Sequence, residues 1–368
     1  MEPQNYLGIY LSKETATVVC LGSQGRDRNV LGCFSVSMQE QEEPNQQVLA
    51  RLIAEGCAER ELKFSQVAVA LDCAMFMQHK VHSEFKNPKQ IAATIRFDAE
   101  DALSTDITDV AIAFKITSSD QAGSGLDVFT AERKILSDVL LSLQSNNIDP
   151  ITIEPDVICL SRFILQNLSL PESRQAGTIF GILSSRNGYF ITFAGLQKSP
   201  AVRTFLIDPA QNRAELLTRE IPVTAALAGT SEPINCLKVF DSTNSIDYID
   251  YQQLSEKLGI EAGSADLFEA AAASPDILAD CAQPVGFAIA YEAASAHLEK
   301  AQSVNFRNDF MPYQGRKVRL QKMLKFLSVS VAALCLALGL YFQLQLLQKT
   351  NTKTSYVTNL RNSTRPLC

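Results

Sequence analysis

Histidine is scarce in this 368-residue chain, and neither histidine nor cysteine follows a metal-binding pattern. Only three histidines occur. Two of them, His79 and His82, stand three apart in a stretch typical of a strand, so they should face opposite sides. The nine cysteines are scattered and form no CxxC pair. We therefore expect no metal site, and cysteines that are buried in a reducing compartment.

The chain also lacks an excess of positive charge. Its 33 Lys and Arg residues are outnumbered by 40 Asp and Glu, and no basic stripe lies outside residues 316–325. This balance argues against a nucleic-acid partner. The first ten residues contain no basic region followed by an apolar run, so they do not form a secretory signal.

What the chain does contain is one long stretch without charge, residues 326–348, between Lys325 and Lys349. As a helix these 23 residues would span roughly 34 Å, against about 30 Å for the bilayer core. Cations are denser in 316–325 than in 349–368, which places the large N-terminal part in the cytoplasm. A buried core helix is the alternative, but such helices rarely lack charge over this length. We expect a single transmembrane helix and a short extracytoplasmic tail.

Strands and helices alternate before this stretch. Three strands with short turns open the chain over 6–36, and three more open a second half over 178–207. The linker-like residues 168–177 separate the halves. Asn87 followed by Pro88 predicts a helix start, whereas the Ala-rich stretch 261–283 predicts loop and short helix.

The predicted fold class is α/β, with a two-lobed cytoplasmic domain followed by one transmembrane helix. The expected parts are a first lobe (1–170), a second lobe (171–302), a junction (303–325), the transmembrane helix (326–348) and the tail (349–368). The tail is too short and polar to bury a core of its own, so an outer domain is either absent or truncated.

Two lobes that each open with three strands follow the plan of the actin, Hsp70 and sugar-kinase (ASKHA) superfamily. In its residues the chain resembles one branch, the PilM/GspL-like family of type IV pilus assembly and type II secretion. The resemblance is carried by LGIYLSKETATVVCL (7–21), QIAATIRFDAEDALSTDITDVAIAF (90–114) and LQSNNIDPITIEPDVICLSRFIL (143–165), of which 90–114 is the most specific. It implies an actin-like domain at the bacterial inner membrane.

The resemblance also implies a nucleotide cleft, but all three of its turns depart from the family pattern. Tyr10 stands at the first Asp position and Ser12 at the following Gly. The second turn is expected at Gly181, and the adenosine turn reads FDSTN around Ser242. Since the Asp orders the metal and the attacking water, we expect no catalysis, no catalytic residue and no bound cofactor.

The preferred function is therefore a non-enzymatic inner-membrane platform subunit of a type II secretion or type IV pilus machine. Its expected partners are the assembly ATPase, other platform proteins and a further copy of the chain. The alternative is a membrane-tethered, PilM-like protein whose lobe angle responds to ATP. A sugar kinase would need a catalytic Asp in the cleft, and the sequence does not locate one.

The junction carries a second resemblance. SVNFRNDFMPYQGRKVRLQK (303–322) is similar to the cytoplasmic N-terminus of PilN, which docks on PilM in that family. The resemblance implies an extended strip that packs on the first lobe, with an asparagine bonded to backbone and apolar side chains in pockets. The implied docking residues are Val304, Asn305, Phe306, Phe310 and Pro312. An ordinary linker is the alternative.

Overall fold

The structure, a computed structural model, describes most of the chain. The described residues are 5–24, 27–38, 45–103, 106–167, 177–193, 200–208, 210–228, 233–242, 249–267, 281, 283–299, 304–315, 324, 328, 330–332, 334–346 and 349. The chain divides into two compact units, residues 1–313 and residues 314–368. The predicted lobe boundary over 168–176 lies outside the described residues.

The first lobe is built on a five-stranded sheet. Its strands are β1 (Asn5–Leu11), β2 (Thr15–Gln24), β3 (Asp27–Ser37), β4 (Gln66–Leu71) and β8 (Thr152–Pro155), in the order β3-β2-β1-β4-β8. The first three strands are antiparallel neighbours, whereas β4 is parallel to both β1 and β8. The central strand β1 is buried along almost its whole length, as expected for a strand covered by helices on both faces.

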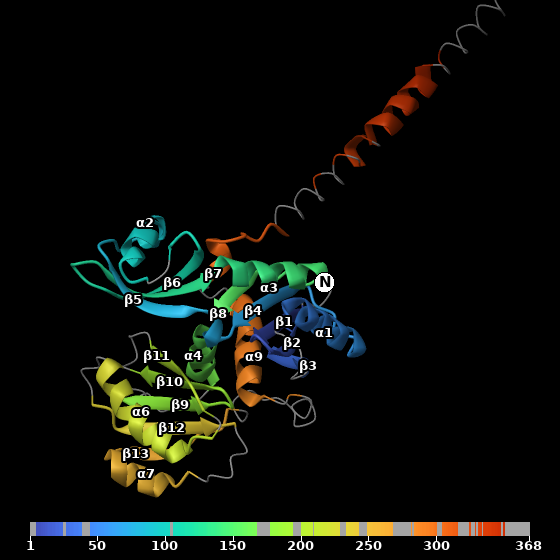
Figure 1. Cartoon of the computed structure of the whole chain (residues 1–368). Coiled ribbons are helices and arrows are strands. Elements are labelled where there is room, and N and C mark those ends of the chain that lie inside the picture. Colours follow the sequence, from blue (N-terminus) through green and yellow to red (C-terminus); the bar gives the residue numbers. More distant parts are fainter. Residues whose placement is uncertain are drawn as a thin grey trace, which may run out of the picture. The chain divides into compact units, whose positions relative to one another are not determined.

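Four helices cover this sheet. α1 (Gln46–Glu59) and α3 (Arg133–Ser145) pack together on one face, and α4 (Asp156–Asn167) and α9 (Pro284–Glu299) on the other (Figure 1). α9 lies so close to β1 that a Cβ on Gly8 would sit 1.8 Å from the carbonyl oxygen of Ala290. Only glycine fits there, and the small residues of α9 make the contact possible.

The second lobe repeats the plan of the first. Its strands are β9 (Thr178–Leu183), β10 (Asn187–Phe193), β11 (Ala201–Leu206), β12 (Cys236–Asp241) and β13 (Glu261–Ser264), in the order β11-β10-β9-β12-β13. Again an antiparallel three-strand unit is followed by two parallel strands. α6 (Arg213–Ala228) and α7 (Tyr251–Leu258) pack together over this sheet (Figure 1). The predicted two-lobed architecture is confirmed.

The expectation of loop and short helix over 261–283 is wrong at its start, where β13 forms. Its four residues, EAGS, show no apolar alternation. Parallel pairing with β12, from Cys236 opposite Glu261 onward, makes this a strand. Long-range pairing here overrides local preference.

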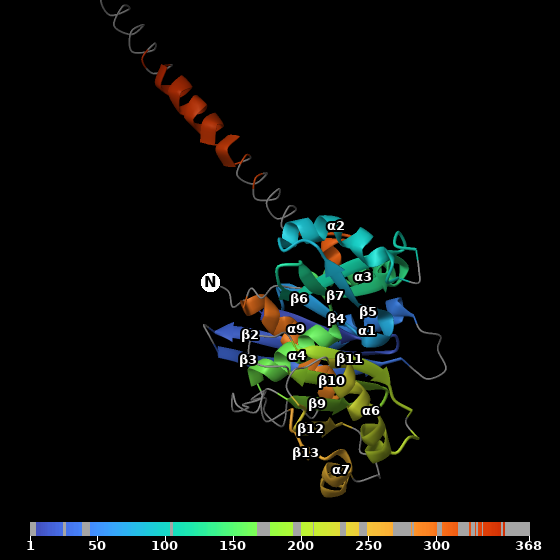
Figure 2. The same cartoon turned by 90° about the vertical axis from the view of Figure 1, so that its left-hand side faces the viewer.

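A third, smaller sheet belongs to the first lobe. β5 (Met77–Ser83), β6 (Val110–Ser119) and β7 (Ser124–Glu132) lie in the order β5-β7-β6, and α2 (Pro88–Glu100) covers one face (Figure 2). The Asn87 side chain accepts a hydrogen bond from Lys89 N at 2.9 Å, which confirms the predicted helix start. β5 joins this sheet by pairing antiparallel with β7, a long-range contact that the local sequence does not predict.

The apolar core runs from the first sheet through α4 and α9 into one face of the second sheet. Phe163 of α4 meets Tyr291 of α9 edge to face, with ring centroids 5.8 Å apart. Phe180 and Phe193 extend the same cluster into the second lobe. The two lobes therefore share one core.

In the second unit, residues 334–346 are helical. Among the described residues no helix is long and apolar enough to cross a membrane. Of the predicted span, residues 326, 327, 329, 333, 347 and 348 lie outside the described residues, as does the tail after residue 349.

Candidate functional site

The candidate site is the cleft between the lobes, a cavity of about 650 Å³. Parallel strands of both sheets point their carboxyl ends at it. Ser12 follows β1, Asp72 follows β4, Ser184 follows β9 and Ser242 follows β12, and all four line the cleft. Crevices at the carboxyl ends of parallel strands are where α/β proteins bind ligands.

Two serine turns with the same bonding pattern face each other across this cleft. In the first, Ser12 N donates to Thr15 O and Thr15 N donates to Ser12 Oγ, both at 2.9 Å. In the second, Ser184 N donates to Asn187 O and Asn187 N donates to Ser184 Oγ, again both at 2.9 Å. Each serine hydroxyl thus accepts a hydrogen bond from a backbone N–H group that would otherwise be available to a phosphate.

The prediction that the second turn lies at Gly181 is wrong. Gly181 lies within β9, opposite Phe190, and the turn comes three residues later, at 184–186. The serine–asparagine pairing closes the hairpin there. Ser242 lies where expected, at the end of β12, and its hydroxyl donates to Leu183 O at 3.0 Å. The next residues of the expected adenosine turn, 243 and 244, lie outside the described part of the chain.

Tyr10 forms part of the cleft floor rather than a phosphate site. Its hydroxyl donates a hydrogen bond to Oδ2 of Asp72, and the Asn187 amide donates to the same oxygen at 2.8 Å. The other oxygen, Oδ1, accepts from Ala74 N at 2.8 Å. Asp72, from the first lobe, is therefore saturated with donors, one of which comes from the second lobe.

A second carboxyl group, Asp156 at the start of α4, is buried beside the first. Its Oδ2 accepts from Tyr189 OH and from Cys73 N, each at 2.9 Å, while its Oδ1 has no hydrogen-bond partner of good geometry among the residues that the structure describes. Burial raises the pKa of Asp156 well above its usual value, and the charge of Asp72 raises it further. Burial likewise raises the pKa of the Tyr189 hydroxyl. Asp156 is thus shifted toward its neutral form.

These contacts join the lobes directly. Asp72–Asn187 and Asp156–Tyr189 bridge them in the cleft interior, and an ion pair between Glu14 and Arg186, 2.5 Å apart, links the two exposed turns. We call these three contacts the latch. Sequence reasoning missed Asp72 and Asp156, although both directly follow neighbouring parallel strands.

A metal ion fits this cluster poorly. The ligand atoms of Asp72, Cys73 and Asp156 lie within 4.8 Å of one another. However, three of the four carboxylate oxygens already accept hydrogen bonds, and burial raises the pKa of the Cys73 thiol, which disfavours the thiolate that binds metals. The expectation of no metal site stays a prediction.

The junction strip lies against the first lobe. Val304, Asn305 and Phe306 are buried, and Asn305 Oδ1 accepts from Ile153 N of the edge strand β8 at 2.9 Å. Asn305 Oδ1 also accepts from Arg307 N, which starts a 3₁₀ turn over Phe306–Asn308. The strip is therefore not extended throughout, because this cap bends it.

Two charged residues that the sequence did not single out hold the strip more firmly. Arg307 is buried and donates to Asp149 Oδ1 and to Met311 O, both at 2.9 Å. Asp309 accepts from Arg96 of α2 at 2.5 Å and from Ile112 N of the edge strand β6 at 3.0 Å. The strip thereby ties the first sheet to the third.

The rest of the strip is less buried. Phe310 is half-buried beneath the Arg133 guanidinium, 5.5 Å from the ring centroid. Pro312 is exposed, so the prediction that it fills a pocket is wrong. The chain turns outward here, with a positive φ at Met311. A docking role for these residues stays a prediction.

Comparison with protein-family models gives no match, and comparison with curated proteins gives none either. Among solved structures, a chain of the "PilM-PilN type IV pilus biogenesis complex" matches with a TM-score of 0.61 at 16% identity, over 79% of this chain and 97% of that one. The predicted PilM-like actin fold is confirmed. The likeness concerns the fold of the two lobes.

Two weaker matches follow. One is the cytoplasmic domain of EpsL, an inner-membrane component of the Vibrio cholerae type II secretion system, with a TM-score of 0.46 and 15% identity over 75% of this chain and 98% of that one. The other is the ethanolamine utilization protein EutJ from Carboxydothermus hydrogenoformans, with a TM-score of 0.37 and 9% identity over 79% and 91%.

Proposed function

We propose that this PilM-like chain is a non-enzymatic inner-membrane platform subunit of a type II secretion or type IV pilus machine. In this role its two lobes stay in the cytoplasm and link an assembly ATPase to membrane partners. Support comes from the fold likeness to a PilM–PilN pilus complex and from the latched cleft.

The latch is the observation that carries the non-enzymatic part. A nucleotide phosphate entering this cleft would meet serine turns whose inner amides are already bonded and a floor closed by Tyr10, Asp72 and Asn187. A bound nucleotide would have to displace these hydrogen bonds. Tyr10 also stands where the family has an Asp, so no carboxylate is placed at that position to order a metal. Phosphoryl transfer depends on such positioning, so its loss removes most of the catalytic rate.

The membrane part rests on the second unit. The described leucines of 334–346 are exposed at positions on every side of the helix, for example Leu336, Leu338, Leu340 and Leu344. A helix that is apolar all round is typical of a membrane span or of a large core. We propose that residues 326–348 span the inner membrane once, as the charge-free run predicts.

A second function, ATP-responsive binding without hydrolysis, is favoured by one observation. Lys13, Arg186 and the first residues of α9 line the cleft, and cations and helix N-termini are the features that bind phosphates. Thermal unfolding of the full chain in detergent, followed by circular dichroism with and without millimolar Mg-ATP, separates the two proposals.

A ligand that binds only the folded state raises its stability by RT ln(1 + [L]/Kd). We expect no rise beyond that given by magnesium tripolyphosphate at equal ionic strength. A rise of several degrees specific to ATP would overturn the platform-only proposal and support the second function.

The partner part needs a separate experiment. We expect an assembly ATPase to co-purify with the intact chain from native membranes in mild detergent. When the chain ends at residue 315, that ATPase should be missing from the membrane fraction. Retention of membrane partners without any ATPase would contradict the linking role.

A further inference from the structure

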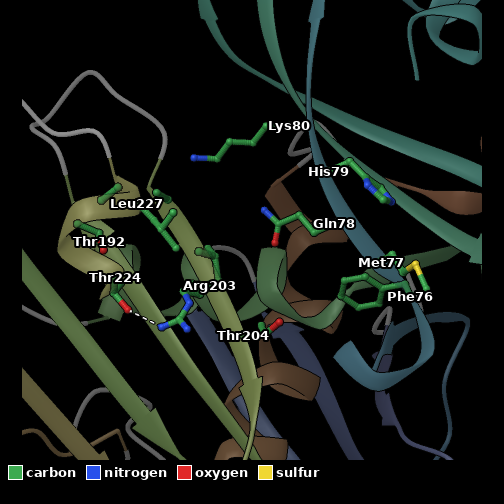
Figure 3. A pocket seen from close by; sticks show the side chains of 13 residues that line it. Phe76, Met77, Gln78, His79, Lys80, Thr192, Arg203, Thr204, Thr224 and Leu227 are labelled. Atoms are coloured by element: carbon green, nitrogen blue, oxygen red, sulfur yellow. Dashed lines mark hydrogen bonds between the residues drawn. The ribbon is translucent and has the colours of Figure 1, made fainter. Parts of the chain in front are cut away.

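A groove of about 690 Å³ separates β5 of the third sheet from β11 of the second lobe (Figure 3). Its lining includes Phe76–Lys80 from one side and Ala201–Thr204 from the other, consecutive residues in both cases. Side chains alternate between the faces of a strand, so a groove that touches consecutive residues borders the edge of the strand.

Both strands are indeed edges. In the described sheets β5 pairs only with β7, and β11 pairs only with β10. An edge strand presents backbone N–H and C=O groups that a further strand can bind. β11 has little of the usual protection against such pairing, since it contains no proline and its one charge is Arg203.

The hydrogen-bond pattern identifies which residues of β11 face the groove. Ile207 N donates to Arg186 O at 2.7 Å, so the backbone of residue 207 points toward β10. Orientation alternates along an antiparallel pair. The N–H and C=O groups of Val202 and Thr204, both of which line the groove, therefore point toward it.

The groove is apolar with a basic rim. Leu227 is 61% exposed on the β11 side of it, where Ala201 and Val202 also line the groove. The side chain of Lys80 reaches into it from β5 (Figure 3). Among the described lining residues there is no carboxylate.

Two carboxylates lie close behind this rim. Asp127 stands opposite Lys80 in the β5–β7 register and is flanked on its other side by Lys115. Arg203 is paired with Glu220 at 2.7 Å. Glu220 is also paired with Arg219 at 2.8 Å, so each of the two carboxylates is shared between two cations and the neighbourhood is net positive, with Lys80 reaching into the groove.

We propose that this groove binds an extended acidic peptide of a partner protein as an added strand on the open edge of β11. Its backbone bonds Val202 and Thr204, its apolar side chains pack against Leu227, and a carboxylate meets Lys80. This is strand addition, in which main-chain bonds give affinity and alternate side chains give specificity. The inference goes beyond the platform role, since it requires neither a membrane nor an ATPase.

The probe is a capped, fluorescein-labelled heptapeptide of alternating valine and glutamate, titrated into the full chain in detergent and followed by anisotropy. We expect saturable binding that Thr204→Pro weakens by about tenfold or more, because proline removes an outward N–H and blocks the edge. The comparison variant, Thr204→Val, keeps the N–H and should lose much less affinity than Thr204→Pro does.

The charge is tested separately. Lys80→Gln should weaken the valine–glutamate peptide by about threefold or more, yet leave a valine–glutamine peptide unchanged. If Thr204→Pro fails to fold, as judged by circular dichroism, a peptide N-methylated at alternate residues removes the same bonds from the other side. Its binding should then be weakened by about tenfold.

Four results would overturn the proposal. The first three are the absence of saturable binding, equal binding by Thr204→Pro and the wild type, and equal binding of the N-methylated peptide. A self-association that Thr204→Pro abolishes, without any peptide binding, would assign the edge to a second copy of the chain and overturn it too.

Discussion

At the scale of single residues, the carboxyl group of Asp156 is buried beside a second carboxyl group, and within the described part of the chain it is hydrogen-bonded through one oxygen, Oδ2. Tyr189 and the Cys73 backbone both donate to that oxygen, which favours a charge, whereas burial and Asp72 oppose it. The net effect is a raised pKa. Ionising this group in the folded state therefore costs stability.

The sign of the pH dependence follows. A carboxyl group with a folded pKa above its unfolded value of 3.8 contributes stability below that value and loses it as the pH rises through the folded pKa. We expect Asp156→Asn, whose amide keeps an acceptor for Tyr189, to gain stability relative to the wild type as the pH rises from about 4. Thermal midpoints between acidic and mildly alkaline pH measure this.

The control for this prediction is Asp101→Asn, which changes an exposed carboxylate on the same lobe. Its midpoint should run parallel to that of the wild type at every pH. Parallel curves for Asp156→Asn as well would show that the folded pKa of this group is not raised.

The sequence came close to this cluster without reaching it. Asp72 and Asp156 directly follow β4 and β8, and the carboxyl ends of neighbouring parallel strands meet at one edge. What it could not supply was the pairing of β8 with β4, which makes the two residues neighbours. Asn187 and Tyr189 depend further on the position of the second turn, which the sequence reasoning had placed at Gly181.

At the scale of elements, the junction strip binds two strand edges through side chains instead of backbone. Asn305 accepts from Ile153 N of β8, and Asp309 accepts from Ile112 N of β6. Each is thus an acceptor for an edge N–H that has no strand beside it in the described sheets. Burial of Phe306 between them adds the apolar part of the contact.

Truncation of the strip should therefore be costly. Asn305→Ala leaves the N–H groups of Ile153 and Arg307 without this acceptor, a loss of about 1–3 kcal/mol in the free energy of unfolding. Phe306→Ala should cost about 3–5 kcal/mol, because the ring is fully buried. Chemical unfolding of the full chain, together with protease resistance of residues 304–315, tests both.

Asn308→Ala is the matched control, since Asn308 lies in the same turn and is exposed. It should change stability by no more than about 0.5 kcal/mol. If Asn305→Ala and Phe306→Ala behave like this control, the strip is an ordinary linker.

Most helices and strands could be predicted from the sequence, because their signals are local. The cap at Asn87 and the largely apolar run of the first strand, which is buried along almost its whole length, are examples. β13 could not be predicted, since only its pairing with β12 makes it a strand. The third sheet was missed for the same reason, because strand order is a property of long-range contacts.

At the scale of the whole molecule, the two lobes repeat the same sheet order. The resemblance therefore concerns the fold, although the residues of the expected nucleotide turns differ from the family pattern. The apolar core supports this arrangement, because it passes through α4 and α9 from one sheet to the other. The membrane span is a proposal at this scale.

That proposal predicts a clear result for a double substitution. Leu336→Arg with Leu338→Arg places two charges near the centre of residues 326–348, each costing about 2.5–3.5 kcal/mol on insertion scales. We expect the variant to leave the carbonate-resistant membrane fraction. Leu336→Phe with Leu338→Phe, which keeps the apolar character, should stay there.

The two sets of contacts that hold the junction strip, at Asn305 and at Asp309, should also break in a fixed order under tension. Asp309, which holds α2 and the third sheet, comes after Asn305, which holds the first sheet, along the chain. A pull applied beyond residue 315 therefore loads the Asp309 contacts first and the Asn305 contact last. The strip would lose its hold on α2 and β6 before its hold on β8, so the junction yields in steps before the fold itself bears the load.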